Sequence, residues 1–160
     1  MLRYVYGHDK IVADFVAQMI SHVRARGFGR CKTIGVIDAE GKLLAGLVYH
    51  DWDPEAERIS MSGAALPGSR WLTRETIRRM FSYPFHQCRC QMVVMTIPKE
   101  DERLQRQLAV YGFRFILFPR MFGRDRDGVV CRLTDDAWAA NRFNRRFRHH
   151  IDDARAQEAA

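Results

Sequence analysis

Apolar residues recur every three to four positions in three stretches of the chain, which predicts three amphipathic helices. These stretches are 9–23, 73–83 and 101–111. Asp9 and Asp101 stand at the starts of two of them, where a carboxylate can accept hydrogen bonds from free helix amides. The first helix is expected to end near Gly27 or Gly29. Pro84 is expected to stop the second, because proline lacks an amide hydrogen and clashes with the preceding turn.

Shorter runs rich in β-branched and aromatic residues predict seven strands. They lie at 2–6, 33–37, 43–50, 58–65, 91–97, 113–118 and 129–133. A turn sequence at 38–41 joins the second run to the third as a hairpin, and the fourth run extends it to a meander. Later in the chain a helix separates two strands, as in a crossover connection. The sequence therefore predicts an α+β fold in a single domain, with a mixed central sheet flanked by helices.

Composition limits the class of protein. The 160 residues are 47% apolar and 28% charged, which is typical of one compact domain and not of a disordered chain. The longest apolar runs fall far short of the roughly 20 residues that a membrane-spanning helix needs. The first ten residues lack the apolar core of a signal peptide, so we expect a cytoplasmic protein with no membrane partner. The four scattered cysteines are expected to be reduced.

The charge balance is strongly basic, with 26 Lys and Arg against 19 Asp and Glu and a net charge of +7. Such a surface attracts polyanions, and arginine binds phosphate in a bidentate manner. The residues expected to contact nucleic acid are Trp52, Trp71, Arg78, Arg142, Arg145 and Arg146. A core role for Trp71, and solvated or partner-docking faces for the arginines, are the alternatives. Segment 135–160 is expected to form a basic C-terminal tail that is helical to about residue 153.

Candidate catalytic side chains gather at the end of the strand 43–50. Because side chains alternate across a strand, Tyr49 and Asp51 are expected on one face and His50 on the other, unless a bulge intervenes. A neutral His50 can accept a proton from an attacking amine. Alternatively, His50 could ligate iron together with Tyr49 or a nearby carboxylate. The structural alternative for His50 is a simple hairpin end.

Four further residues are predicted to bind a cofactor. Ser60 and Ser62 share the polar face of the strand 58–65, where they could form hydrogen bonds. Arg70 and Arg74 begin a series of arginines that recurs every four residues and continues to Arg78, which predicts one basic stripe on a helix. Like charges at this spacing repel one another, so such a stripe is tolerated where the arginines bind phosphate.

The order of elements, together with the pair Gly112-Phe113, resembles the GNAT acyltransferase superfamily. Within its local signature, however, Asp101, Leu104 and Leu108 stand where the family usually has Asn, Ala and Tyr. The family also carries a glycine-rich loop whose amides surround pyrophosphate. In this chain Trp71 and Thr73 replace the glycines of that loop. The resemblance implies a GNAT-like domain over residues 1–134, followed by the tail 135–160.

A narrower resemblance carries the first functional hypothesis. The runs 47–52, 59–64, 70–74 and 83–85 look like phage and prophage GNAT-fold proteins, which include the Mom DNA-modification family. That resemblance implies a transferase that places a carbamoylmethyl group on the exocyclic amine of adenine and so protects phage DNA from restriction. The resemblance also implies that Asp127 completes a catalytic centre with Tyr49 and His50, and that these three residues could hold iron; a solvated turn is the alternative for Asp127. DNA would then be the partner, iron a candidate cofactor, and acetyl-CoA or an aminoacyl-tRNA the acyl donor. A homodimer is a candidate assembly.

Two other functions stay open at this point. One is a conventional acetyl-CoA-dependent N-acetyltransferase acting on a small amine or a protein, with Arg70 and Arg74 holding the pyrophosphate. The other is a GNAT-fold module that binds DNA without catalysing a reaction.

Overall fold

The computed structural model describes residues 1–144. Its elements follow the order that the sequence predicts, which confirms the α+β class. They are β1 (Arg3–Val5), α1 (Asp9–Met19), β2 (Cys31–Ile37), β3 (Leu43–Asp53), β4 (Arg58–Ala65), α2 (Arg74–Ser82), β5 (Met92–Pro98), α3 (Glu102–Tyr111), β6 (Arg114–Phe118), β7 (Gly128–Thr134) and α4 (Asp135–Ala140). No helix among these residues is both long enough and apolar enough to cross a bilayer.

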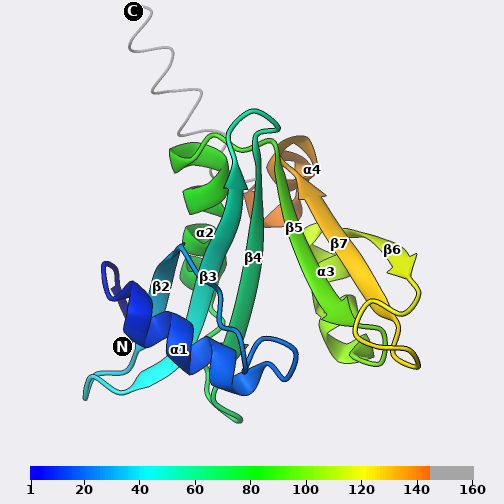
Figure 1. The fold of residues 1–160 in the computed structure, drawn as a ribbon. Coiled ribbons are helices and arrows are strands. Elements are labelled where there is room, and N and C mark those ends of the chain that lie inside the picture. The colour runs from blue at the N-terminus through cyan, green and yellow to red at the C-terminus, as the bar shows by residue number, and fades with distance from the viewer. Residues whose placement is uncertain (145–160) are drawn as a thin grey trace, which may run out of the picture.

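The sheet divides into two lobes that meet at a fork between β4 and β5. Its strand order is β1-β2-β3-β4-β5-β7-β6, and every neighbouring pair is antiparallel except β4 and β5. These two parallel strands pair only through 58–60 and 92–94. Beyond that point they separate, as Figure 1 shows in the widening space between the two lobes. The fork therefore leaves strand edges unpaired in the middle of the sheet.

Helix α1 packs across β2, β3 and β4 on one face of the sheet (Figure 1). Close approach needs a residue without a side chain at position 46. A Cβ added to Gly46 would lie 2.6 Å from Cγ2 of Val16 and 2.8 Å from Cγ1 of Val12. Asp9 does not cap the helix as predicted. Its carboxylate instead accepts from the amide and hydroxyl of Thr33 at 2.8 and 3.0 Å, and so fastens α1 to β2.

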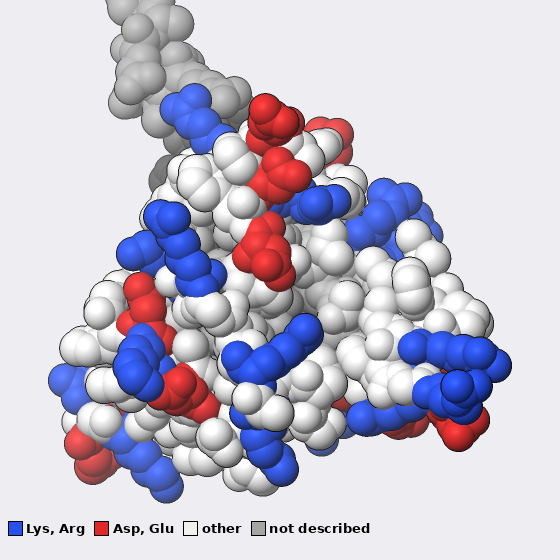
Figure 2. Space-filling view, in the orientation of Figure 1, with Lys and Arg blue, Asp and Glu red and all other residues white. Residues whose placement is uncertain are grey.

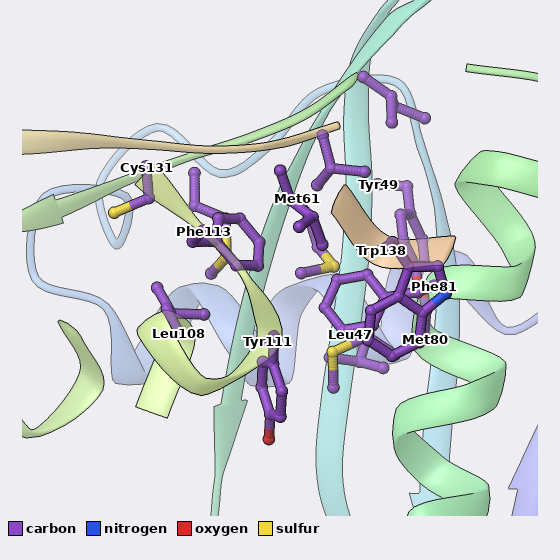
Figure 3. Packing of buried hydrophobic residues seen from close by; sticks show 14 of the residues in the cluster. Leu47, Tyr49, Met61, Met80, Phe81, Leu108, Tyr111, Phe113, Cys131 and Trp138 are labelled. Carbon is purple, nitrogen blue, oxygen red and sulfur yellow. The ribbon is translucent and has the colours of Figure 1, made fainter. Parts of the chain in front are cut away.

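The other face of the sheet carries the main core. Phe81 of α2 is fully buried among aromatic rings (Figure 3), in a cluster that also includes Leu47 of β3 and Leu133 of β7. Its ring centroid lies within 6.4 Å of those of Phe85, Tyr111, Phe113 and Trp138. Trp138 belongs to α4, so the start of the segment 135–160 packs on the same core as the rest of the domain. One hydrophobic cluster thus holds the two lobes together behind the fork.

Two predicted helix ends differ from the structure. Helix α2 ends at Ser82, close to the predicted end at residue 83, but Pro84 does not end the helical structure, because the chain continues through a π-helical turn at Tyr83–Gln87 that accommodates proline in its first positions. The predicted long C-terminal helix is interrupted at Asn141. This residue is extended, and its side chain accepts from the amide of Phe143 at 3.0 Å. The remainder of the predicted tail, from residue 145, lies outside the described residues.

Candidate active site at the fork

Tyr49 and His50 point to opposite faces of β3, as strand alternation predicts. Tyr49 is buried beneath α2, and its hydroxyl donates to the carbonyl oxygen of Met80 at 2.6 Å. Burial raises the pKa of Tyr49 well above its ordinary value, and the neighbouring Tyr83 adds to this effect. The predictions that Tyr49 is catalytic or ligates a metal are therefore wrong, because its hydroxyl is sealed in the core and already bonded.

Replacing Tyr49 with phenylalanine tests this correction. We expect Tyr49→Phe to lower the free energy of unfolding by about 1–3 kcal/mol, because the buried carbonyl of Met80 loses its hydrogen-bond donor. Chemical denaturation followed by circular dichroism measures this loss. Any transfer activity of the folded variant should equal that of the wild type, and a stable but inactive variant would restore Tyr49 as a catalytic residue.

His50 faces the side of the sheet that carries α1, and it joins two polar partners. Its Nδ1 lies 2.7 Å from Oδ2 of Asp51, and its Nε2 lies 3.2 Å from Oγ of Ser62. The carboxylate of Asp51 reaches back because β3 bulges there. The register shifts between His50 and Asp53, and Asp51 has a left-handed backbone with φ of 50°. The bulge thus overrides alternation and brings Asp51 to its neighbouring imidazole.

A cavity of about 300 Å³ opens beside His50. Ser62 of β4 and Thr96 of β5 both line it, so it lies at the fork where these strands have separated. The loop between α1 and β2 covers it from the side of α1. The full lining is His22, Val23, Arg26, Gly27, Phe28, Gly29, His50, Asp51, Ser62 and Thr96. The fork therefore contains a small polar chamber with an imidazole on its wall.

His22 is a wall residue that the sequence did not single out. Its ring stacks on Phe122 at 4.3 Å between centroids, and its Nδ1 is buried without a hydrogen-bond partner among the described residues. Burial, followed by the charges of Arg126 and Arg26, lowers the pKa of His22. Only the spatial meeting of two loops reveals this residue, since no motif surrounds it. A neutral His22 can therefore face the chamber beside His50.

Comparison with solved structures assigns the fold. Over 87% of this chain and 96% of its own, a spermidine N-acetyltransferase from Vibrio cholerae superposes with a TM-score of 0.71 at 12% identity. A manganese complex of the spermidine/spermine N-acetyltransferase SpeG from the same organism covers 84% and 91% of the two chains, with a TM-score of 0.64 and 14% identity. The chain has the GNAT acetyltransferase fold.

A third GNAT structure, described as "Probable acetyltransferase", matches 69% of this chain and 65% of its own with a TM-score of 0.59 and 15% identity. No protein-family model matches the chain, and a search of curated proteins gives no match. At these identities the likeness establishes the fold alone. None of these three structures is described as a DNA-modifying protein.

The predicted iron site does not assemble in this GNAT fold. Asp127 is not among the residues that line the His50 cavity. Its carboxylate accepts from the amide of Arg120 at 3.0 Å and lies 3.9 Å from Nζ of Lys99, so it organises the loop before β7. Residues 1–144 contain no cluster of three His, Cys, Asp or Glu side chains that could hold a metal ion. The residues proposed as iron ligands therefore do not fit one ion, and Asp127 does not join His50 in a catalytic centre.

The start of α2 is where a GNAT fold places its glycine-rich pyrophosphate loop. Here Oγ1 of Thr73 accepts from the amide of Thr76 at 3.1 Å, and the hydroxyl of Thr76 donates to the carbonyl of Trp71. The amide of Thr76 is thus satisfied within the helix, and Trp71 and Thr73 stand where the glycine cradle for coenzyme A would need bare backbone. Arg70 and Arg74 are exposed nearby. That they bind a donor stays a prediction.

The predicted arginine stripe is not continuous on this helix. Helix α2 begins at Arg74, so Arg70 precedes it. Arg78 donates to Glu75 at 2.9 and 2.7 Å, and Arg79 donates to the same carboxylate at 2.7 Å. Figure 2 shows acidic side chains interspersed with the basic ones over the visible face. Arg78 is therefore held in an ion pair rather than in a row of unpaired charges.

The other residues predicted to bind nucleic acid do not share one environment. Trp71 is half-buried and packs against the hydrophobic core, which favours its structural role. Trp52, by contrast, is 57% exposed at the end of β3. Arg142 lies 5.5 Å from the ring centroid of Phe143, while Arg145 and Arg146 lie outside the described residues. Nucleic-acid binding by these side chains stays a prediction.

Proposed function

We propose that this protein is an N-acyltransferase, which transfers an acyl group from an activated donor to an amine held in the cavity beside His50. One observation carries the proposal. In a GNAT acetyltransferase fold, the fork between β4 and β5 contains a chamber lined by an imidazole that is already bonded to a carboxylate. The fold alone supplies an architecture, and the His50 chamber supplies the acid–base group that amide formation needs.

The chemistry follows from the two ring nitrogens of His50. Donation from Nδ1 to Asp51 fixes the neutral imidazole in the form whose Nε2 can accept a proton. An amine loses a proton as it forms an amide, and Nε2 is placed to receive that proton. The carboxylate of Asp51 then stabilises the positive imidazolium. His50 is therefore the proposed general base and Asp51 the residue that orients it.

The dimensions of the chamber favour a small amine as acceptor. Its volume is about 300 Å³, and its lining combines polar side chains with the ring of Phe28, which lies 5.1 Å from the imidazole of His50. The finer hypothesis of a DNA acceptor rested partly on Tyr49 and on an unpaired arginine stripe, but Tyr49 is buried and bonded to Met80, and Arg78 is paired with Glu75. We therefore place a small primary amine first and retain adenine in DNA as an acceptor to be tested.

A product assay tests the proposal. Purified protein is incubated with acetyl-CoA or with a small acetyl thioester, and with spermidine, a lysine-containing peptide or an adenine-containing DNA duplex. Mass spectrometry identifies the products. We expect an N-acetylated small amine that forms in proportion to enzyme concentration. An adenine adduct would instead support DNA modification, and the absence of any acylated amine with every donor would contradict the proposal.

The self-capped start of α2 leads to a prediction about the donor. Acetyl N-acetylcysteamine carries the thioester but none of the phosphates of coenzyme A. We expect its kcat/KM to lie within about tenfold of that of acetyl-CoA, because Trp71 and Thr73 replace the glycines whose amides would bind the phosphates in the transition state. Initial rates of thiol release with each donor measure this ratio. A preference of several thousandfold for acetyl-CoA would show that the phosphates are bound after all.

The homodimer remains a proposal, and strand β6 offers a surface on which two copies could pair. Strand β6 forms an edge of the sheet, and Ile116, Leu117 and Phe118 are each more than half exposed there. An apolar edge strand favours pairing with another strand.

A further inference from the structure

Three side chains in the chamber form a continuous hydrogen-bonded series. Asp51 contacts Nδ1 of His50, and Nε2 of the same ring contacts Oγ of Ser62. This order of carboxylate, imidazole and hydroxyl is the arrangement that activates a serine as a nucleophile. An isolated serine hydroxyl is a weak nucleophile, whereas one bonded to a basic imidazole can lose its proton as it attacks. The geometry thus gives Ser62 a chemical capacity of its own.

The register of the sheet separates Ser62 from the similar residue Ser60. Both point to the side of α1, and Ser60 is the direct partner of His50 across the strands. Yet the imidazole reaches diagonally to Ser62, and Ser62 lines the cavity while Ser60 does not. The difference follows from the fork, because β4 still pairs with β5 at Ser60 and has left it at Ser62. Only Ser62 is open to a molecule within the chamber.

We propose that Ser62 is the nucleophile of a two-step transfer and carries the acyl group as an ester between donor and acceptor. This inference rests on the proposed N-acyltransferase function. In the first step Oγ of Ser62 attacks the carbonyl carbon of a thioester donor, and its proton passes to Nε2 of His50. The carbon–sulfur bond breaks, and the departing thiolate takes that proton. An acyl ester on Ser62 and a free thiol result.

The second step returns the enzyme to its initial state. The amine nitrogen attacks the ester carbonyl, and its proton passes to Nε2 of His50. The bond between the acyl carbon and Oγ breaks, and Oγ recovers the proton from the imidazole. The products are an amide and the free hydroxyl of Ser62. Asp51 holds Nδ1 throughout and stabilises the imidazolium in both steps.

Two observations favour this route over direct attack of the amine on the donor. Nε2 of His50 is already bonded to Oγ of Ser62, so this hydroxyl, rather than an incoming amine, is placed to give up its proton first. In addition, Trp71 and Thr73 replace the glycines of the loop that would hold a donor beside the acceptor for simultaneous reaction. With the acyl group covalently attached to Ser62, the donor need not stay bound while the amine reacts.

The direct test is detection of the acylated serine. The protein is mixed with acetyl N-acetylcysteamine in the absence of an amine, quenched in acid and weighed intact by mass spectrometry. We expect a mass increase of one acetyl group, removable by hydroxylamine. Trypsin releases the fragment 59–70, and its fragment ions should place the acetyl group on Ser62 and not on Ser60. Double-reciprocal plots of transfer to the amine should give parallel lines.

Variants separate a covalent role from a structural one. We expect Ser62→Ala to abolish the adduct and to lower transfer by a factor on the order of 10²–10³. Ser62→Cys should form a thioester adduct instead, and so tests the proposal if the alanine variant does not fold. Ser82→Ala, at the end of α2 outside the chamber, should match the wild type. Equal melting temperatures by circular dichroism confirm that each variant is folded.

Two outcomes overturn the proposal, and they are distinguishable. If the wild type transfers acyl groups without an adduct, with intersecting kinetic lines and with full activity in Ser62→Ala, the relay is wrong and the N-acyltransferase function stands. If no donor acylates either Ser62 or an amine, the proposed function fails together with the relay.

Discussion

Substitution of His50 by alanine is expected to lower kcat for acyl transfer by a factor on the order of 10²–10⁴, the usual contribution of a general base. The reason is that the chamber then lacks the group that receives a proton from Ser62 or from the amine. Steady-state assay of the amide product measures the loss. Binding of the donor should change less than kcat, because the imidazole contacts the reacting atoms rather than the rest of the donor.

His86 provides a matched control for this variant. It is exposed on the π-helical turn after α2 and contacts Ser82 at 3.3 Å, away from the chamber lining. His86→Ala should retain wild-type kcat. A folded His50→Ala protein with undiminished turnover would return His50 to the role of an ordinary hairpin-end histidine.

Substitution of Phe81 by alanine is expected to have the largest effect on stability. The ring is fully buried and touches aromatic rings from α3, α4 and the turn after α2, so its removal leaves a cavity where the two lobes meet (Figure 3). We expect the free energy of unfolding to fall by about 3–5 kcal/mol. Urea denaturation followed by circular dichroism measures this difference.

An exposed residue on the opposite face controls for general effects of truncation. Ile11 of α1 is 66% exposed, and Ile11→Ala should change the free energy of unfolding by less than about 0.5 kcal/mol. A loss of less than about 1 kcal/mol for Phe81→Ala would show that the cluster around it is not what joins the lobes.

The sequence predicted the order of elements because hydrophobic periodicity records burial directly. The ends of the helices could be predicted less well from the sequence. The turn after α2 accepts Pro84 by widening to a π-helical turn, an adjustment that depends on the packing of Phe85 and on tertiary context. Asp9 looked like a cap because of its position, yet its carboxylate has better partners on β2 that only the fold brings near.

The site was predictable in part, for a physical reason that Asp51 illustrates. Alternation correctly separates Tyr49 from His50, but a left-handed residue at position 51 has no unambiguous signature, since aspartate tolerates that conformation without requiring it. The sequence places Ser62 on the correct face of its strand. It could not predict the contact of Ser62 with His50, because that contact depends on the strand register and on the fork. His22 was missed because a loop from the other lobe supplies its partner, Phe122.

Nuclear magnetic resonance of the histidine imidazoles tests most directly whether an amine is processed at the fork. The best acceptor from the product assay is titrated into protein whose ring nitrogens carry ¹⁵N. We expect saturable shifts of the resonances of His50 and His22, which line the chamber, and none for His86. Shifts confined to histidines outside the chamber, or no shift at amine concentrations that saturate turnover, would contradict the account.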